Sequence, residues 1–294
     1  MNEFVTYQSE AQYAVITLVN GKANAINHKV IEGLNSSLDT AEKENKVVIL
    51  TGQSGIFSAG FDLKIMTKSP ESAKELVTKG SELSLRMLSF PQPIVIACSG
   101  HAIAKGAFLL LSSDYRIGVD GPFKIGLNEV MIGMTMHHAG IVIAKSRLSE
   151  VYLNRSINNA EIFNSKQALA AGFLDRIVPE LQLMETAIKV AEMFSKLNKK
   201  AHATTKLKVR KSHLEALAKA IKLDFISLMT PSKHSSTYKK DRVCFPSPHI
   251  SISPPLAVSA TFRQKAAGAF SRPSFQDPSG PKILWNRAMR TSRP

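Results

Sequence analysis

The sequence predicts an α/β layered fold with parallel strand pairing. Two observations lead to this prediction. Strand-like apolar runs alternate with helix-like segments in a strand, strand, helix rhythm, and the runs at 47–50 and 94–98 are apolar throughout. With 294 residues and 44% hydrophobic residues, the chain is long enough to bury a sizeable core and has the composition of an ordinary globular protein.

The first predicted elements are a hairpin and a helix. Strand-like runs at 4–7 and 14–19 flank a turn at 9–12. Asn27 has the side-chain type that caps helices. The residues after it place apolar side chains on one helical face: Val30, Ile31, Leu34 and Leu38.

In the middle of the chain the pattern of a strand, a glycine-containing turn and a helix occurs twice. In order, these segments are a strand at 47–50, a turn at 57–64, a helix at about 70–88, a strand at 94–98, a turn at 99–107 and a helix at 105–113. A third strand at 115–119 precedes a loop that ends at Glu129.

The last part of the chain is predicted to be mostly helical and then to become irregular. The predicted elements are helices at about 139–148 and 149–155, a short helix at 165–171, a strand at 173–178, and helices at about 180–197 and 202–228. Residues 1–195 form the expected core and 196–230 a helical segment. The tail at 231–294 is rich in Pro, Ser and Arg, so we expect it to be irregular or disordered, with a partner-binding segment around Trp285 as the alternative.

The net charge of +15 raises the question of an anionic partner. Nucleic acid or an anionic membrane would fit this charge, but we expect solvated helix faces, a loose basic tail and attraction of a phosphate-bearing small molecule. Outside the tail, much of the excess charge lies on Lys196, Lys199, Lys200, Lys206, Lys208, Arg210 and Lys211.

The cysteines and the apolar runs indicate a compartment. Cys98 lies in an apolar run and is expected to be a small buried side chain, and with Cys244 as the other cysteine a disulfide scaffold is not expected. We see no secretory signal and no apolar run near the roughly 20 residues of a membrane helix. A cytoplasmic location is therefore the expectation.

The two glycine-containing turns, 57–64 and 99–107, are the most informative chemical feature. Each leads into a predicted helix, and such turns leave backbone N–H groups unpaired. Two of these turns that face one point would form a site for a negatively charged oxygen.

Four motifs carry a family resemblance. They are Gly21–Asn27 (GKANAIN), Phe57–Leu63 (FSAGFDL), Pro93–Gly100 (PIVIACSG) and Leu127–Gly133 (LNEVMIG). In this order and spacing they resemble the crotonase (enoyl-CoA hydratase/isomerase) superfamily, from about residue 4 to 228. The resemblance implies a crotonase-like spiral of ββα units with C-terminal oligomerisation helices that form a trimer or a pair of trimers. The helix at 202–228 offers an apolar stripe for that contact: Leu207, Leu214, Leu217, Ile221 and Phe225.

The resemblance also implies a substrate and a site. The substrate is an acyl-coenzyme A thioester of fatty acid metabolism, so coenzyme A belongs to the substrate and neither a separate cofactor nor a metal is expected. The backbone N–H groups of Phe61 and Lys105 match the oxyanion hole that holds the thioester oxygen, and Glu129 matches a catalytic acid/base. The residues that match the coenzyme A contacts are Lys22, Ala23, Ala25, Ala59, Asp62 and Leu63.

The chain departs from the family pattern in the second turn, where Lys105 stands in a usually glycine-rich stretch. The backbone N–H can still serve if φ is negative, but the Lys105 side chain must then point away from the thioester. Asp62 is expected to cap the first turn. His137 and His138 are expected in a polar loop, with contact to the acyl group as the alternative.

The number of carboxylates favours one reaction. Phe108 stands where a hydratase of this family has its second glutamate, and a double-bond shift needs only one carboxylate to carry a proton. An enoyl-CoA isomerase is therefore favoured, with an enoyl-CoA hydratase that uses Glu129 and an ordered water as the alternative. An alternative of another class is a non-catalytic protein on this scaffold that binds nucleic acid or a membrane through its basic surface. We expect Val130, Met131 and Ile132 to raise the pKa of Glu129 by desolvation.

Overall fold

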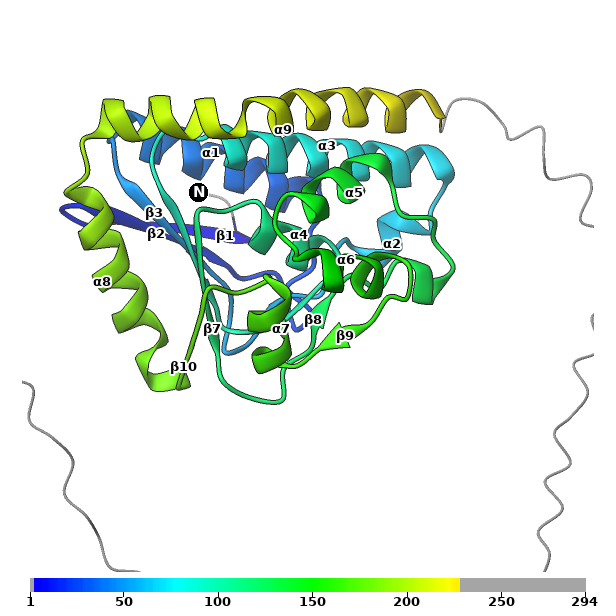
Figure 1. The fold of residues 1–294 in the computed structure, drawn as a ribbon, viewed down its shortest axis with the longest axis horizontal. Coiled ribbons are helices and arrows are strands. Elements are labelled where there is room, and N and C mark those ends of the chain that lie inside the picture. Colours follow the sequence, from blue (N-terminus) through cyan, green and yellow to red (C-terminus); the bar gives the residue numbers. More distant parts are fainter. Residues whose placement is uncertain (1–2, 228–294) are drawn as a thin grey trace, which may run out of the picture. The chain divides into compact units, whose positions relative to one another are not determined.

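Two β-sheets organise residues 3–227 (Figure 1). The computed structural model describes residues 3–227, so the predictions for Cys244, Trp285 and the tail at 231–294 lie outside the described residues. The larger sheet has the order β1 (Val5–Ser9), β2 (Tyr13–Leu18), β3 (Val47–Thr51), β5 (Ile94–Cys98), β7 (Tyr115–Val119) and β10 (Arg176–Val178). Its pairs are parallel except for the β1–β2 hairpin, which confirms the predicted layering.

Except for the short helix at 63–66, which was not predicted, the α-helices begin and end close to the predicted positions. They are α1 (His28–Lys43), α2 (Leu63–Met66), α3 (Pro70–Ser89), α4 (Lys105–Leu111), α5 (His138–Lys145), α6 (Glu150–Ile157), α7 (Ser165–Ala171), α8 (Leu183–Ser195) and α9 (Lys199–Ser227), with 3-10 turns η1 (Val130–Ile132) and η2 (Glu180–Gln182). The Asn27 side chain accepts a hydrogen bond from the Val30 N–H, so the predicted cap of α1 is confirmed.

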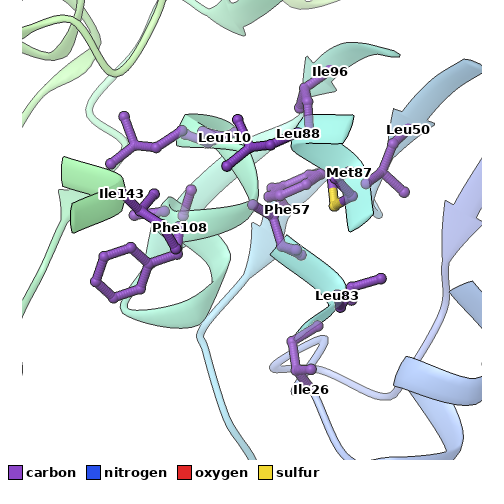
Figure 2. Close-up of a cluster of buried hydrophobic side chains, with 14 of the residues drawn as sticks. Ile26, Leu50, Phe57, Leu83, Met87, Leu88, Ile96, Phe108, Leu110 and Ile143 are labelled. Carbon is purple, nitrogen blue, oxygen red and sulfur yellow. The ribbon is translucent and has the colours of Figure 1, made fainter. Parts of the chain in front are cut away.

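Helices cover both faces of the larger sheet. Every residue of β3 and β5 is buried, which is typical of parallel strands between two helical layers. On one face α1, α3 and α4 pack with the sheet in the main core, where Leu50, Leu83 and Ile96 meet Phe57 (Figure 2). On the other face α8 packs on β3, β5 and β7. Cys98 is buried, as predicted, and burial raises the pKa of its thiol to about 12.

The second sheet was not predicted. It has the order β4 (Gly55–Ser58), β6 (Gly100–Ile103), β8 (Ile125–Gly126) and β9 (Ile162–Phe163), and the sequence suggested turns at 57–64 and 99–107 instead. These strands have two to four residues and contain three glycines, so they lack the β-branched runs that identify strands. Gly100 is required for the pairing, since a Cβ there would lie 2.1 Å from the carbonyl oxygen of Gly55.

The long helix α9 lies along α3 and also contacts α5 (Figure 1). Three positions of the predicted oligomerisation stripe serve the chain's own core: Leu217 and Ile221 are buried, and Leu214 packs against them. Leu207 and Phe225 are each 45% exposed. The trimer stays a prediction, and the part of the stripe available to another subunit is smaller than the sequence suggested.

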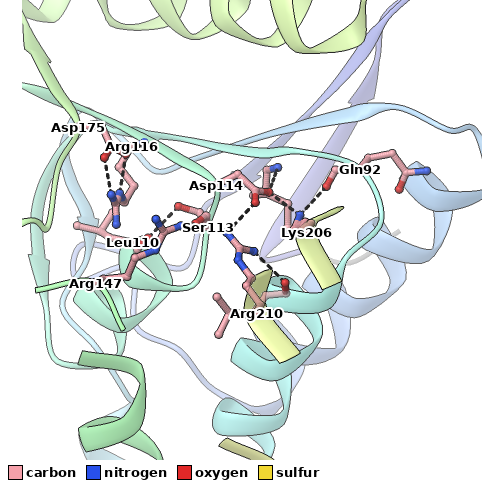
Figure 3. Close-up of polar contacts among 11 residues, drawn as sticks. Gln92, Leu110, Ser113, Asp114, Arg116, Arg147, Asp175, Lys206 and Arg210 are labelled. Carbon is pink, nitrogen blue, oxygen red and sulfur yellow. Dashed lines mark hydrogen bonds and ion pairs between the residues drawn. The ribbon is translucent and has the colours of Figure 1, made fainter. Parts of the chain in front are cut away.

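Two of the basic residues expected on a solvated face of this helix are bound instead (Figure 3). Lys206 Nζ lies 2.6 Å from Asp114 Oδ2, and Arg210 Nη2 lies 2.9 Å from Asp114 Oδ1. Lys206 is only 7% exposed. The solvated-face prediction is therefore wrong for Lys206 and Arg210, because an acidic residue that precedes β7 is close enough to pair with both.

No helix among residues 3–227 has the length and the apolar composition needed to cross a membrane.

Candidate active site

The two glycine-containing segments approach each other at the points where β4 and β6 end. A Cβ built on Gly60 would lie 3.3 Å from the Lys105 backbone nitrogen and 2.9 Å from the Ala104 Cβ. Gly60 has a φ of 101°, which is a left-handed conformation that favours glycine. The close approach therefore depends on a residue without a side chain at this position.

The Phe61 and Lys105 N–H groups are both free to bind a ligand atom. The next N–H group along the chain already has a partner: the Asp62 N–H donates to the Ile26 carbonyl oxygen at 2.9 Å. Lys105 opens α4, where the first N–H groups have no partner inside the helix. Within residues 3–227 neither the Phe61 nor the Lys105 N–H has a hydrogen-bond acceptor. The geometry suits an oxyanion, and the role itself stays a prediction.

Both side chains turn to α3. A Cβ on Gly80 would lie 2.4 Å from Phe61 Cζ and 3.3 Å from Lys105 Cε, so this glycine makes room for both. The Lys105 side chain is buried and donates hydrogen bonds to α3. That it points away from the thioester stays a prediction. Sequence reasoning missed Gly80, although a lone glycine inside a helix often has a packing reason.

Backbone strain accompanies the second turn. Ala104 has φ 50° and ψ −120°, a combination in which glycine is the usual residue, while Lys105 is not among the described residues with positive φ. Such a conformation costs a non-glycine residue about 1–3 kcal/mol. The strained residue stands directly before one of the two candidate donors.

We expect Ala104→Gly to raise the free energy of unfolding by about 1 kcal/mol. The substitution relieves the positive φ, and the greater freedom of glycine in the unfolded chain offsets part of the gain. Urea unfolding of both proteins measures the difference. A loss of stability would contradict the strain assigned to Ala104.

Glu129 supplies a buried carboxylate near the second turn. It follows β8 by three residues, and the Gly126 carbonyl oxygen in β8 accepts the Ala104 N–H at 3.0 Å. Glu129 is 7% exposed, and its Oε2 has no hydrogen-bond partner within the described part of the chain. Burial raises the pKa of Glu129 from 4.5 to about 7. A carboxylate in this state can accept or donate a proton near neutral pH.

The predicted direction of that pKa shift and its cause, desolvation, are confirmed. The three neighbours expected to supply the desolvation are themselves partly exposed: Val130 is 44%, Met131 63% and Ile132 51% exposed. They form the 3-10 turn η1, which begins directly after Glu129. The turn separates a buried carboxylate from an exposed apolar surface.

The residues matched to coenzyme A contacts lie on two adjoining segments. Ile26 and Phe61 pair as a parallel bridge, and the Ala59 N–H donates to the Ala23 carbonyl oxygen at 3.0 Å. Asp62 caps α2 by accepting from the Lys64 N–H at 2.9 Å, which confirms its capping role. Four of the six residues are exposed and two are half-buried. The exposed ones are Lys22, Ala23, Ala59 and Leu63, and the half-buried ones are Ala25 and Asp62.

Asn24 fixes these segments and was not singled out from the sequence. Its side-chain amide donates to the carbonyl oxygens of Leu18 at 3.0 Å and Phe57 at 2.9 Å. It is fully buried and has a φ of 47°, which asparagine tolerates better than most residues.

His137 is not in a polar loop. It precedes α5, and its ring lies edge-on to Phe108 with 5.5 Å between the ring centroids. Burial lowers the pKa of His137 to about 4. His138 is exposed and begins α5, where its backbone N–H donates to Asp224 of α9 at 2.8 Å. The sequence offered no signal for Asp224, because the capping carboxylate comes from a helix 86 residues away.

Known proteins share this fold. The family profile described as Enoyl-CoA hydratase/isomerase matches residues 8–244. The crystal structure of an enoyl-CoA hydratase/isomerase family protein from Pseudomonas syringae is 55% identical, has a TM-score of 0.76, and the match covers 77% of this chain and 99% of that one.

Curated relatives carry both activity names. A probable enoyl-CoA hydratase of Bacillus subtilis is 37% identical over 131 residues, which are 43% of this chain and 50% of the relative. The mitochondrial enoyl-CoA delta isomerase 1 of Mus musculus is 34% identical over 135 residues, which are 44% of this chain and 47% of the relative. The chain thus spans about half the length of these curated relatives.

The spiral of strand, strand and helix units defines the class of the protein as a crotonase-fold protein. Because the family profile covers most of the sequence, the chain belongs to the enoyl-CoA hydratase/isomerase family.

Proposed function

We propose that the protein is a Δ3,Δ2-enoyl-CoA isomerase. The observation that carries this proposal is the buried Glu129, whose carboxylate has an unpartnered oxygen. Phe108, which stands where a second glutamate would be needed, is buried in the apolar core and cannot transfer a proton. One carboxylate is enough to move a proton between two carbons.

In the proposed reaction the Glu129 carboxylate removes a proton from C2 of a 3-enoyl-CoA thioester. The electrons move onto the thioester oxygen, which accepts hydrogen bonds from the Phe61 and Lys105 N–H groups. The protonated Glu129 then returns the proton to C4, and the double bond lies between C2 and C3. Removing one such donor typically costs about 2.7–4 kcal/mol of transition-state stabilisation.

Assays with 3-enoyl-CoA and 2-enoyl-CoA thioesters test this function. We expect double-bond migration to exceed water addition. Water addition as the faster reaction would make the protein a hydratase, in line with the name of the Bacillus subtilis relative. Turnover of neither thioester, together with nucleic-acid binding that weakens steeply with salt, would favour a non-catalytic role.

Gly60→Ala tests the proposed oxyanion hole, since backbone donors cannot be removed by substitution. The new Cβ would lie 2.9 Å from the Ala104 Cβ and 3.0 Å from the Ile103 carbonyl oxygen, so the two turns must separate. We expect kcat to fall about 100-fold, the effect of losing one donor. Adding Ala104→Gly removes one of the two clashing atoms and should restore part of the activity. An unchanged kcat in Gly60→Ala would contradict the assignment.

A further inference from the structure

The Lys105 side chain is a buried cation that the proposed mechanism does not use. Its Nζ donates to the Gly80 carbonyl oxygen at 2.5 Å and to Ser84 Oγ at 2.6 Å, and the residue is 3% exposed. Among residues 3–227 no carboxylate lies within ion-pair distance of this ammonium. Buried charges are normally paired, so this one lacks its usual compensation.

The groups around the ammonium leave its charge unbalanced. Helix α3 presents a carbonyl and a hydroxyl, neither of which titrates near neutral pH. From the start of α5 comes His137, whose pKa burial lowers and the Lys105 charge lowers further. Asp224 of α9 faces His137, whose pKa its charge raises, and it accepts hydrogen bonds from the His138 and Ala139 N–H groups at 2.8 and 2.9 Å. Burial lowers the pKa of Lys105 to about 7.

The position of the cation relates it to the reaction. Lys105 also supplies a proposed oxyanion-hole N–H, and a lysine stem holds its ammonium within about 10 Å of an oxygen bound to that N–H. Negative charge on that oxygen would compensate the unbalanced cation. Because the ammonium is buried, its attraction to that oxygen exceeds that of a surface pair.

We propose that the Lys105 ammonium stabilises the enolate electrostatically from behind the oxyanion hole. This inference rests on the proposed enolate chemistry. The side chain does not touch the substrate; it provides positive charge at a fixed distance, and its hydrogen bonds to Gly80 and Ser84 fix that distance.

The test is the pH profile of kcat/KM for wild type and for Lys105→Met. In the wild type we expect a bell with both limbs near pH 7, since Glu129 must be deprotonated and Lys105 protonated. Lys105→Met should lower the maximum about tenfold and remove the alkaline limb. Methionine has a similar volume and removes a buried charge, so the variant is expected to fold. Thermal unfolding checks this.

Lys74→Met is the matched control. Lys74 is a buried lysine of α3 whose Nζ lies 4.0 Å from the centre of the Phe225 ring, so the same charge is removed at another place. The control should keep the bell-shaped profile. An alkaline limb that persists in Lys105→Met, or that also disappears in Lys74→Met, would overturn the inference.

A binding measurement separates this inference from the proposed reaction. A 3-oxoacyl-CoA thioester forms an enolate that absorbs in the near ultraviolet, so the enolate fraction of the bound molecule can be measured without turnover. We expect a smaller enolate fraction in Lys105→Met than in wild type, whether the enzyme proves to be an isomerase or a hydratase. An equal fraction in both proteins would refute the role of Lys105 even if the isomerase activity is found.

Discussion

Glu129→Gln is expected to lower kcat for a 3-enoyl-CoA thioester by about 10³-fold or more. The amide has nearly the shape of the carboxylate but cannot accept the C2 proton, and general acid–base catalysis is typically worth about 10²–10⁴-fold. Phe108, which stands where a hydratase of the family has its second glutamate, is buried in the core and offers no carboxylate there. Steady-state kinetics on the purified variant, with the wild type measured in parallel, gives the ratio.

The same substitution is expected to stabilise the protein at pH 8. Burial raises the pKa of Glu129 from 4.5 to about 7, so the folded protein binds this proton more tightly than the unfolded chain. The resulting stability is complete below pH 4.5 and is lost as the pH rises through 7. At pH 8 the wild type carries a buried charge that costs about 3 kcal/mol, and the neutral amide should recover about 2 kcal/mol of it.

Urea unfolding at pH 5 and at pH 8 measures this effect. Glu129→Gln should exceed the wild type at pH 8 and differ little from it at pH 5. The control is Glu32→Gln on the exposed face of α1, which should change neither stability nor activity. Activity above a tenth of wild type, or no gain at pH 8, would contradict the assignment of Glu129.

The sequence predicted the larger sheet and its helices because their signals are local. Uninterrupted apolar runs mark β3 and β5, and Asn27 stands at the cap of α1. The second sheet gave no such signal. Its strand β6 depends on close contact between Gly100 and Gly55, which are 45 residues apart in the sequence.

The candidate site was predictable in its backbone and less so in its side chains. The motifs and their spacing identified Phe61, Lys105 and Glu129 as candidates. The structure places the segments that carry Phe61 and Lys105 side by side. The contacts of the Lys105 ammonium depend on its tertiary neighbours in α3. The packing of His137 on Phe108 depends on how the start of α5 lies against α4. Exposure of Val130 likewise depends on how η1 lies on the surface, which hydrophobicity alone does not reveal.

The buried pairs of Asp114 lead to the largest expected loss of stability. Asp114 precedes β7 and binds Lys206 and Arg210 of α9, and it also accepts the Ile94 N–H of β5 at 2.7 Å (Figure 3). Asp114→Asn keeps the side-chain volume but leaves two largely buried cations without their carboxylate. Removing one partner of a buried ion pair typically costs about 3–5 kcal/mol, so we expect a loss of about 3 kcal/mol in the free energy of unfolding.

Two further variants distinguish lost charge compensation from a general effect of substitution. Asp39 and Arg86 lie 2.5 Å apart, but their side chains are 58% and 27% exposed, so Asp39→Asn should cost less than about 1 kcal/mol. Lys206→Met leaves Asp114 paired with Arg210 and should cost less than Asp114→Asn. Helix α9 contacts both α3 and α5, and its Asp224 accepts the His138 N–H at the start of α5, next to His137. The Asp114 pairs therefore help to hold in place the helix that caps α5. Equal losses in all three variants would contradict the role assigned to Asp114.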